Sequence, residues 1–142
     1  MKQPVLETKS TYKGYPYVVL FMPGAYRCGY VGVPYSHKLA KKSFDDLGYL
    51  SCHGGVTYAE SHLYNCNDEN TWWIGFDCAH CFDGYDVDAV KQYFGDDPDF
   101  KRIFYTMEDF WRESNNDSEI EIRSLAYVKD EYKKLIDQIE KE

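Results

Sequence analysis

The pattern of apolar and polar positions predicts strands in the first half of the chain and helices in the second. Two segments rich in valine and tyrosine, Tyr15–Met22 and Arg27–Val33, flank the turn signal Pro23-Gly24 and are predicted to pair. The run Thr71–Phe76 predicts a central strand, and shorter strands are expected at 48–52 and 56–58. Residues 1–13 are polar, and we expect them to be loosely held.

Helix signals dominate the second half. Asp86 is suited to cap a short helix that ends near Phe94, before Gly95, and a less regular helix is expected from 97–99 to Trp111. After Ser124, apolar residues recur at the spacing of one helical face: Leu125, Val128, Tyr132, Leu135, Ile136 and Ile139. This face must be buried against the sheet or against a second copy, so a homo-oligomer through this helix is a further expectation.

The order of these elements defines the expected fold class. Strands come first and helices last, which favours an α+β fold over a doubly wound sheet. We predict a single domain over residues 1–142, with a mostly antiparallel sheet and a C-terminal amphipathic helix packed on it.

Composition and charge exclude several classes of protein. An aromatic content of 18% in 142 residues can build a substantial core and argues against disorder. A net charge of −8 disfavours general DNA or RNA binding. The longest apolar run, Tyr17–Met22, is far shorter than the roughly 20 residues of a membrane span, and residues 1–4 lack the core of a signal peptide. Five cysteines, an odd number, argue against a fully paired disulfide framework. We therefore expect a cytoplasmic protein without membrane partners.

Candidate ligands concentrate where cations are absent. Residues 43–90 contain no Lys or Arg, but they hold nine Asp or Glu, three of the four His and four of the five Cys. Such oxygen, nitrogen and sulfur donors suit a divalent metal ion, and His53, Asp77 and His80 are the candidate ligands, with Cys81 beside them. The alternative is that the cysteines are small buried residues and the histidines are hydrogen-bonded structural groups. The cofactor therefore stays open.

Two cysteine chemistries are weaker alternatives. Cys78-x-x-Cys81 has the spacing of a redox motif, but Phe82-Asp83-Gly84 interrupts the helix that such a motif needs, and acidic neighbours disfavour a thiolate. Cys78 and His80 would share one face of a strand and could form a nucleophile–base pair.

Glycines and aromatic residues indicate a ligand pocket. His53-Gly54-Gly55 is a flexible turn that allows close approach of the backbone to a ligand. Tyr58 and Trp73, together with Arg27 or His37, would supply stacking and phosphate contacts for a small nucleotide. Core packing is the alternative role for these aromatic residues.

Four separated motifs resemble a family of small proteins encoded by phages and prophages. They are GYVGVP at 29–34 followed by His37, HGGVTY at 53–58, WIGFDCAH at 73–80 with Asp83, and a C-terminal pattern of Tyr127-Val128, Glu131, Leu135 and Gln138. The resemblance covers residues 27–83 and 124–139. The chain has Cys81 where the family tends to have a small residue, which argues against Cys81 as an essential ligand, and Lys38-Leu39 where the family tends to have Pro-Leu.

The resemblance implies an accessory protein of the phage type, acting inside a bacterial host cell. Such proteins often counteract host defence, some of them by sequestering nucleotide immune signals. The leading expectation is a non-enzymatic binder of a small polar or nucleotide-type ligand, with a site drawn from Arg27, His37, His53, Gly54, Gly55, Tyr58, Trp73, Asp77, His80 and Asp83. The alternatives are a divalent-metal-dependent hydrolase that uses the same His and Asp residues, and an inhibitor that binds a host protein.

Overall fold

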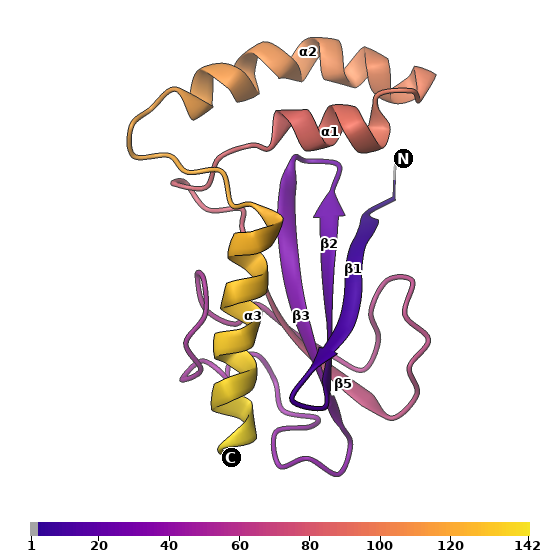
Figure 1. Cartoon of the computed structure of the whole chain (residues 1–142), viewed down its shortest axis with the longest axis vertical. Helices are drawn as coiled ribbons and strands as arrows, with labels where there is room; N and C mark the ends of the chain where they lie inside the picture. Colours follow the sequence, from indigo (N-terminus) through magenta and orange to yellow (C-terminus); the bar gives the residue numbers. More distant parts are fainter. Residues whose placement is uncertain (1–2) are drawn as a thin grey trace.

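Five antiparallel strands form one sheet in the computed structural model, which describes residues 3–142 (Figure 1). The strand order is β1-β2-β3-β5-β4. The strands are β1 (Val5–Tyr12), β2 (Tyr15–Met22), β3 (Tyr26–Pro34), β4 (Tyr58–Glu60) and β5 (Thr71–Asp77). Three helices follow the strands along the chain, so the predicted α+β fold with an antiparallel sheet is confirmed.

The N-terminal segment differs from the expectation of a loosely held chain. Val5–Tyr12 pairs with β2 along its length, and a turn at Lys13 and Gly14, both with positive φ, joins the two strands. Main-chain hydrogen bonding to a neighbouring strand needs no strong apolar pattern, which is why composition alone missed β1. Residues 1–2, part of the same prediction, lie outside the described residues.

Of the two short strands predicted around the HGG turn, one is wrong and one is shifted. Residues 48–50 continue a series of turns, in which the N–H of Gly48 donates to the carbonyl of Asp45 and the N–H of Leu50 to that of Leu47, and 51–52 have no regular secondary structure. Leu47 and Leu50 are buried and anchor this segment to the core. Near 56–58, only Tyr58–Glu60 pairs with β5.

The helices begin at the capping residues that the sequence indicates. Asp86 caps α1 (Val87–Phe94) through the N–H of Ala89, and Ser124 caps α3 (Leu125–Glu140) through that of Tyr127. Between them, α2 (Pro98–Asn115) is a regular helix of 18 residues, longer and more regular than expected, capped by Asp97.

Three apolar clusters hold these elements together. Helix α3 lies along one face of the sheet and buries Tyr132, Leu135 and Ile136 there (Figure 1). The opposite face buries Trp73 under the loop that carries Leu63. Helices α1 and α2 stack at one end of the sheet, above β2 and β3. The apolar face of α3 is thus covered within one chain, and a homo-oligomer through α3 stays a prediction.

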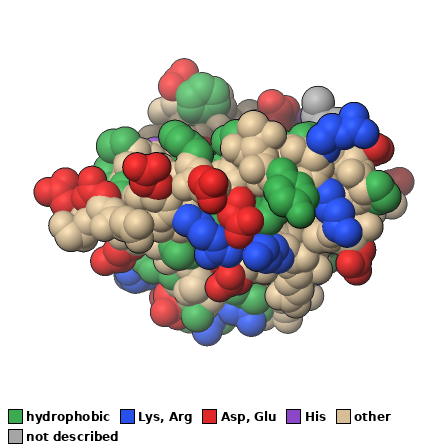
Figure 2. All heavy atoms as spheres, turned by 90° about the horizontal axis from the view of Figure 1, so that it is seen from above, with side chains coloured by type: hydrophobic (Ala, Val, Ile, Leu, Met, Phe, Trp, Pro, Cys, Tyr) green, Lys and Arg blue, Asp and Glu red, His purple; other side chains and the backbone are tan. Residues whose placement is uncertain are grey.

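The surface over α1 and α2 has no single sign of charge. Viewed from that end, acidic and basic side chains are intermixed with hydrophobic ones (Figure 2). Within residues 3–142, no helix is long and apolar enough to cross a membrane.

Candidate functional site

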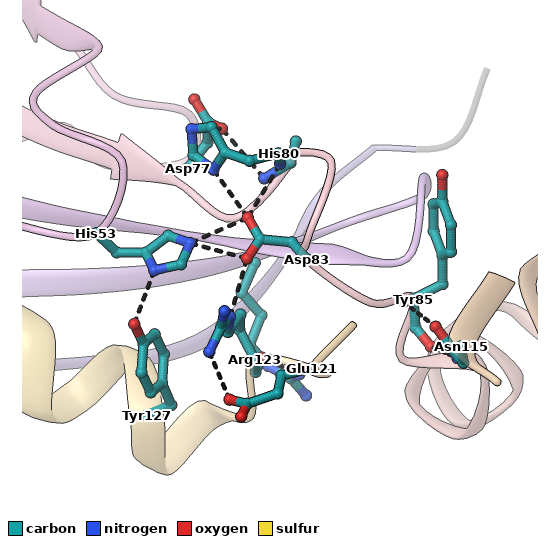
Figure 3. Close-up of polar contacts among 11 residues, drawn as sticks. His53, Asp77, His80, Asp83, Tyr85, Asn115, Glu121, Arg123 and Tyr127 are labelled. Carbon is teal, nitrogen blue, oxygen red and sulfur yellow. Dashed lines mark hydrogen bonds and ion pairs between the residues drawn. The ribbon is translucent and has the colours of Figure 1, made fainter. Parts of the chain in front are cut away.

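Three cationic or polar side chains converge on the carboxylate of Asp83 (Figure 3). His53 Nε2 lies 2.9 and 3.0 Å from its two oxygens, and His80 Nδ1 lies 2.8 Å from Oδ2. Arg123 Nε donates to Oδ1 at 2.9 Å, and the backbone N–H of His80 donates to Oδ2 at 3.0 Å. The Asp83 side chain is almost fully buried, so it organises this site from within.

The backbone around Asp83 is fixed by a short bridge to a distant segment. β5 ends at Asp77, and the following turn is closed by the N–H of Asp83 donating to the carbonyl of His80. The N–H of Gly84 donates to the carbonyl of Glu121 at 2.7 Å, and the N–H of Glu121 donates to that of Phe82 at 3.1 Å. This bridge brings the residues just before α3 to the end of the sheet, and Arg123 with them.

The HGG turn sets both histidines. His53 Nδ1 lies 2.7 Å from the hydroxyl of Tyr127 on α3, so contacts at both nitrogens fix its ring. Gly54 has φ +70° and packs directly under the ring of His80, so a Cβ at this position would overlap that ring. The close approach expected of this turn is therefore made to His80. At Gly55, which has φ +85°, a Cβ would point into open space.

Hydrogen bonds keep the Asp83 carboxyl ionised although it is buried. Burial alone raises the pKa of the Asp83 carboxyl, but the hydrogen bonds from His53, Arg123 and His80 outweigh it and hold the pKa at about 2. Asp83 is thus a carboxylate at neutral pH, and it accepts hydrogen bonds from both imidazoles.

His80 connects this buried cluster to an open cleft. Asp83 holds its Nδ1, while Nε2 lies 3.8 Å from Asp77 Oδ1. Asp77 is itself oriented by Thr57, whose hydroxyl donates to Oδ2 at 3.0 Å. The cleft has a volume of about 540 Å³ and is lined by His80, Cys81, Asp83, Tyr85, Phe110, Glu113, Ser114, Asp117 and Ile120.

Arg27 lies outside this cleft, in a buried ion-pair network. Its guanidinium donates to Glu7 Oε1 and to Asp86 Oδ2, each at 2.6 Å, and to the carbonyl of Arg123 at 3.1 Å. The side chain is only 6% exposed. The structure thus corrects the expected role of Arg27: it ties β3 to β1 and α1 and is not available to a ligand phosphate.

His37 is also far from the cluster. It follows β3 at Pro34, whereas Cys28, opposite Asp77, lies at the other end of that strand. Six residues of strand separate these positions by about 20 Å. The Nδ1 of His37 accepts the N–H of Leu39 at 3.0 Å, so this nitrogen is engaged in the turn after β3.

The two aromatic candidates belong to the opposite face of the sheet. Trp73 is completely buried there, and its indole N–H has no hydrogen-bond partner among the described residues. Tyr58 packs edge-on against Tyr30 and donates to the carbonyl of His62. Trp73 is therefore a core residue, and Tyr58 lines a different, smaller hollow, which Asp77 also borders.

The set of possible metal ligands in the structure differs from the predicted set by one residue. One nitrogen each of His53 and His80 and one oxygen of Asp83 lie within 4.8 Å of one another. Asp77, which the sequence placed in this set, sits instead beside the other nitrogen of His80. Cys81 is exposed in the cleft wall, while Cys78 is buried, and burial raises the pKa of its thiol. That shift disfavours Cys78 as a nucleophile.

Two residues of the Asp83 cluster were not singled out from the sequence, nor were the cleft residues Tyr85, Phe110, Glu113 and Asp117. Arg123 lies 40 positions beyond its partner Asp83, and only the chain path through α1 and α2 brings them together. Tyr127 was noted as part of the C-terminal pattern, without a role. The position of Arg123 directly before the helix cap Ser124 places it at the start of α3. The sequence spacing between Arg123 and Asp83 gives no indication that the two residues are partners.

Comparisons with known proteins add no assignment. No family model, curated protein or solved structure matches this chain.

Proposed function

We propose that this protein is a non-enzymatic binding protein that holds a small polar ligand in the cleft beside His80. The observation that carries the proposal is the fixed orientation of that imidazole. Asp83 contacts its Nδ1, and the ring forms part of the cleft wall. A volume of about 540 Å³ is in the range of small-molecule sites. His80 is therefore held in one orientation toward a ligand before the ligand arrives, which lowers the cost of ordering it on binding.

The lining of the cleft indicates the chemistry of the ligand. Glu113 and Asp117 supply carboxylates, Tyr85 and Phe110 supply aromatic surface, and none of the lining residues is Lys or Arg. Carboxylates accept hydrogen bonds from hydroxyl and amino groups, and they repel phosphate. A nucleoside-type group, with an apolar ring and several donors, fits this lining better than a bare phosphate does.

The resemblance to phage proteins supports a more specific form of the proposal. A nucleotide-derived host immune signal would place its base and ribose in the cleft and leave its phosphates toward solvent, because Arg27 and His37 lie elsewhere. Sequestration of such a signal would be a counter-defence function.

Ligand depletion tests the proposal. The protein is incubated with adenosine, with a cyclic nucleotide and with a cyclic ADP-ribose-type nucleotide, and the free ligand is measured after ultrafiltration. Heat denaturation then releases what was bound. We expect depletion of at least one compound and its recovery intact. His80→Ala should abolish depletion, and His62→Ala, a change at an exposed histidine outside the cleft, should not.

The other outcomes favour other functions. Recovery of a cleaved product would refute the binding proposal and support metal-dependent hydrolysis, which the convergence of His53, His80 and Asp83 favours as the second candidate. Failure to deplete any of the compounds would count against the nucleoside-type ligand. That result would favour inhibition of a host protein, for which α2 offers the exposed side chains of Ile103 and Phe110.

A further inference from the structure

We propose that His53, His80 and Asp83 bind one divalent transition-metal ion of the zinc type. The three residues come from the HGG turn and from the loop after β5, and their ligand atoms already lie within 4.8 Å of one another. Both imidazoles point at the same carboxylate (Figure 3). The metal site does not depend on the small-ligand proposal, because it concerns the buried side of His80 and is tested with the metal alone.

The donor set and its spacing suit such an ion. Imidazole nitrogen and carboxylate oxygen are ligands of Zn²⁺, and bonds of about 2.0–2.2 Å in tetrahedral geometry place the ligand atoms about 3.3 Å apart. In the structure, the two nitrogens lie 2.8 to 3.0 Å from the carboxylate oxygens. Each nitrogen–oxygen separation would therefore have to widen by a few tenths of an ångström to admit the ion, and the two nitrogens lie within 4.8 Å of each other. His80 and Asp83 also line the cleft, from which a fourth ligand can approach.

Each histidine can carry its proton on the ring nitrogen that would face away from the ion. Metal-bound histidines usually donate their other ring N–H to a carboxylate, carbonyl or water. When Nε2 of His53 binds the ion, its proton can sit on Nδ1, which lies 2.7 Å from the hydroxyl of Tyr127. When Nδ1 of His80 binds the ion, its proton can sit on Nε2, which faces Asp77 at 3.8 Å. The hydroxyl of Tyr127 is thus within hydrogen-bond distance of His53, whereas the carboxylate of Asp77 would have to move closer to accept from His80.

One charge in the site opposes a bound cation. The guanidinium of Arg123 is 2.9 Å from Asp83 Oδ1, so it competes for one of the two oxygens and repels the ion. Glu121 binds the same guanidinium at 2.7 Å and offsets part of its charge. The Oδ2 atom does not contact the guanidinium and is the oxygen for the metal, although it also accepts the backbone N–H of His80 at 3.0 Å.

A bound ion would add a chemical capacity to the cleft. A zinc-type ion lowers the pKa of a water in an open coordination position, which is the chemistry that the hydrolase alternative requires. Binding of the ion and hydrolysis are separate claims, and titration of the metal measures binding only.

Calorimetric titration of Zn²⁺ into chelator-treated protein tests the site. We expect one ion per chain for the wild type and for the control His62→Ala, and at least tenfold weaker binding for His53→Ala and His80→Ala. Tyr127→Phe removes the outer partner of His53, and such losses weaken metal binding about 10-fold or more. Co²⁺ is the second probe: its visible absorption bands should show four-coordinate geometry in the wild type and disappear in His80→Ala.

Two results would overturn the metal site. One is the absence of saturable Zn²⁺ binding by the wild type, and the other is binding that is unchanged in both His53→Ala and His80→Ala. His53 is buried, so His53→Ala could disturb folding, but the half-buried His80 allows a folded variant that keeps the test decisive. Depletion of a nucleoside without Zn²⁺ binding would leave the proposed function standing and refute the metal site alone.

Discussion

The contact between Gly54 and His80 gives a prediction whose size can be worked out from the structure. Gly54→Ala adds a methyl group that would overlap Cε1 and Nε2 of His80. We expect the imidazole to turn away from Asp83, so that its 2.8 Å contact to Oδ2 is lost. The substitution therefore acts on the site through one identified side chain.

The expected loss of stability has two parts. An alanine at φ +70° costs about 1–2 kcal/mol in backbone strain. Loss of a hydrogen bond to the buried carboxylate adds about 1.5–3 kcal/mol. Gly55→Ala is the matched control, because Gly55 also has positive φ but has nothing within 4 Å of the position that an alanine methyl group would take. The difference between the two variants, about 1.5–3 kcal/mol, isolates the displacement of His80.

Urea unfolding of the two variants measures this difference, and a double-mutant cycle assigns it. In a His80→Ala background, Gly54→Ala should cost no more than Gly55→Ala, because the ring that it would strike is gone. Equal losses for Gly54→Ala and Gly55→Ala in the wild-type background would refute the reasoning. So would a Gly54→Ala penalty that persists in full without His80.

Three further predictions concern stability. Leu135→Ala removes a fully buried side chain between α3 and the sheet and should cost about 2–5 kcal/mol in urea unfolding, whereas a loss under about 0.5 kcal/mol would show that α3 is peripheral. Arg27→Ala leaves the buried carboxylate of Glu7 without its cation and should cost about 3–5 kcal/mol by the same measurement; a loss within about 0.5 kcal/mol would contradict the buried ion pair. Because the folded pKa of Asp83 is depressed to about 2, its contribution is complete well above pH 4 and is lost as the pH falls toward 2. Between neutral pH and pH 2, the free energy of unfolding measured with urea should fall by about 2 kcal/mol less in Asp83→Asn than in the wild type. The exposed control Asp109→Asn should show the same fall as the wild type.

The fold could be predicted from sequence where the local signals were strong. Asp86 and Ser124 mark the starts of α1 and α3 because a side-chain oxygen must satisfy the first helical N–H groups. Strand β1 was missed because its stability comes from pairing with β2, which is a tertiary effect. The predicted strand at 48–52 failed for a similar reason: Leu47 and Leu50 are buried from turns, not from a strand.

The candidate site shows the same division. Clustering in sequence pointed to His53 and His80 together with Asp77, and Asp83 came from the family resemblance. The structure brings His53, His80 and Asp83 together and leaves Asp77 beside the other nitrogen of His80. Arg27 was misassigned because an arginine on a strand gives no sign of its buried partners, Glu7 and Asp86. Long-range partners such as Arg123 depend on the path of the whole chain and were beyond reach of a spacing argument.

Native mass spectrometry is the measurement that tests the central claim most directly. Wild-type and His80→Ala protein would be purified from the producing cells and their intact masses compared, with and without a chelator. The wild type should carry one small organic molecule per chain, released chemically unchanged on denaturation, and His80→Ala should carry none. A wild-type chain without an organic adduct, or the same adduct on both proteins, would contradict a ligand site at His80.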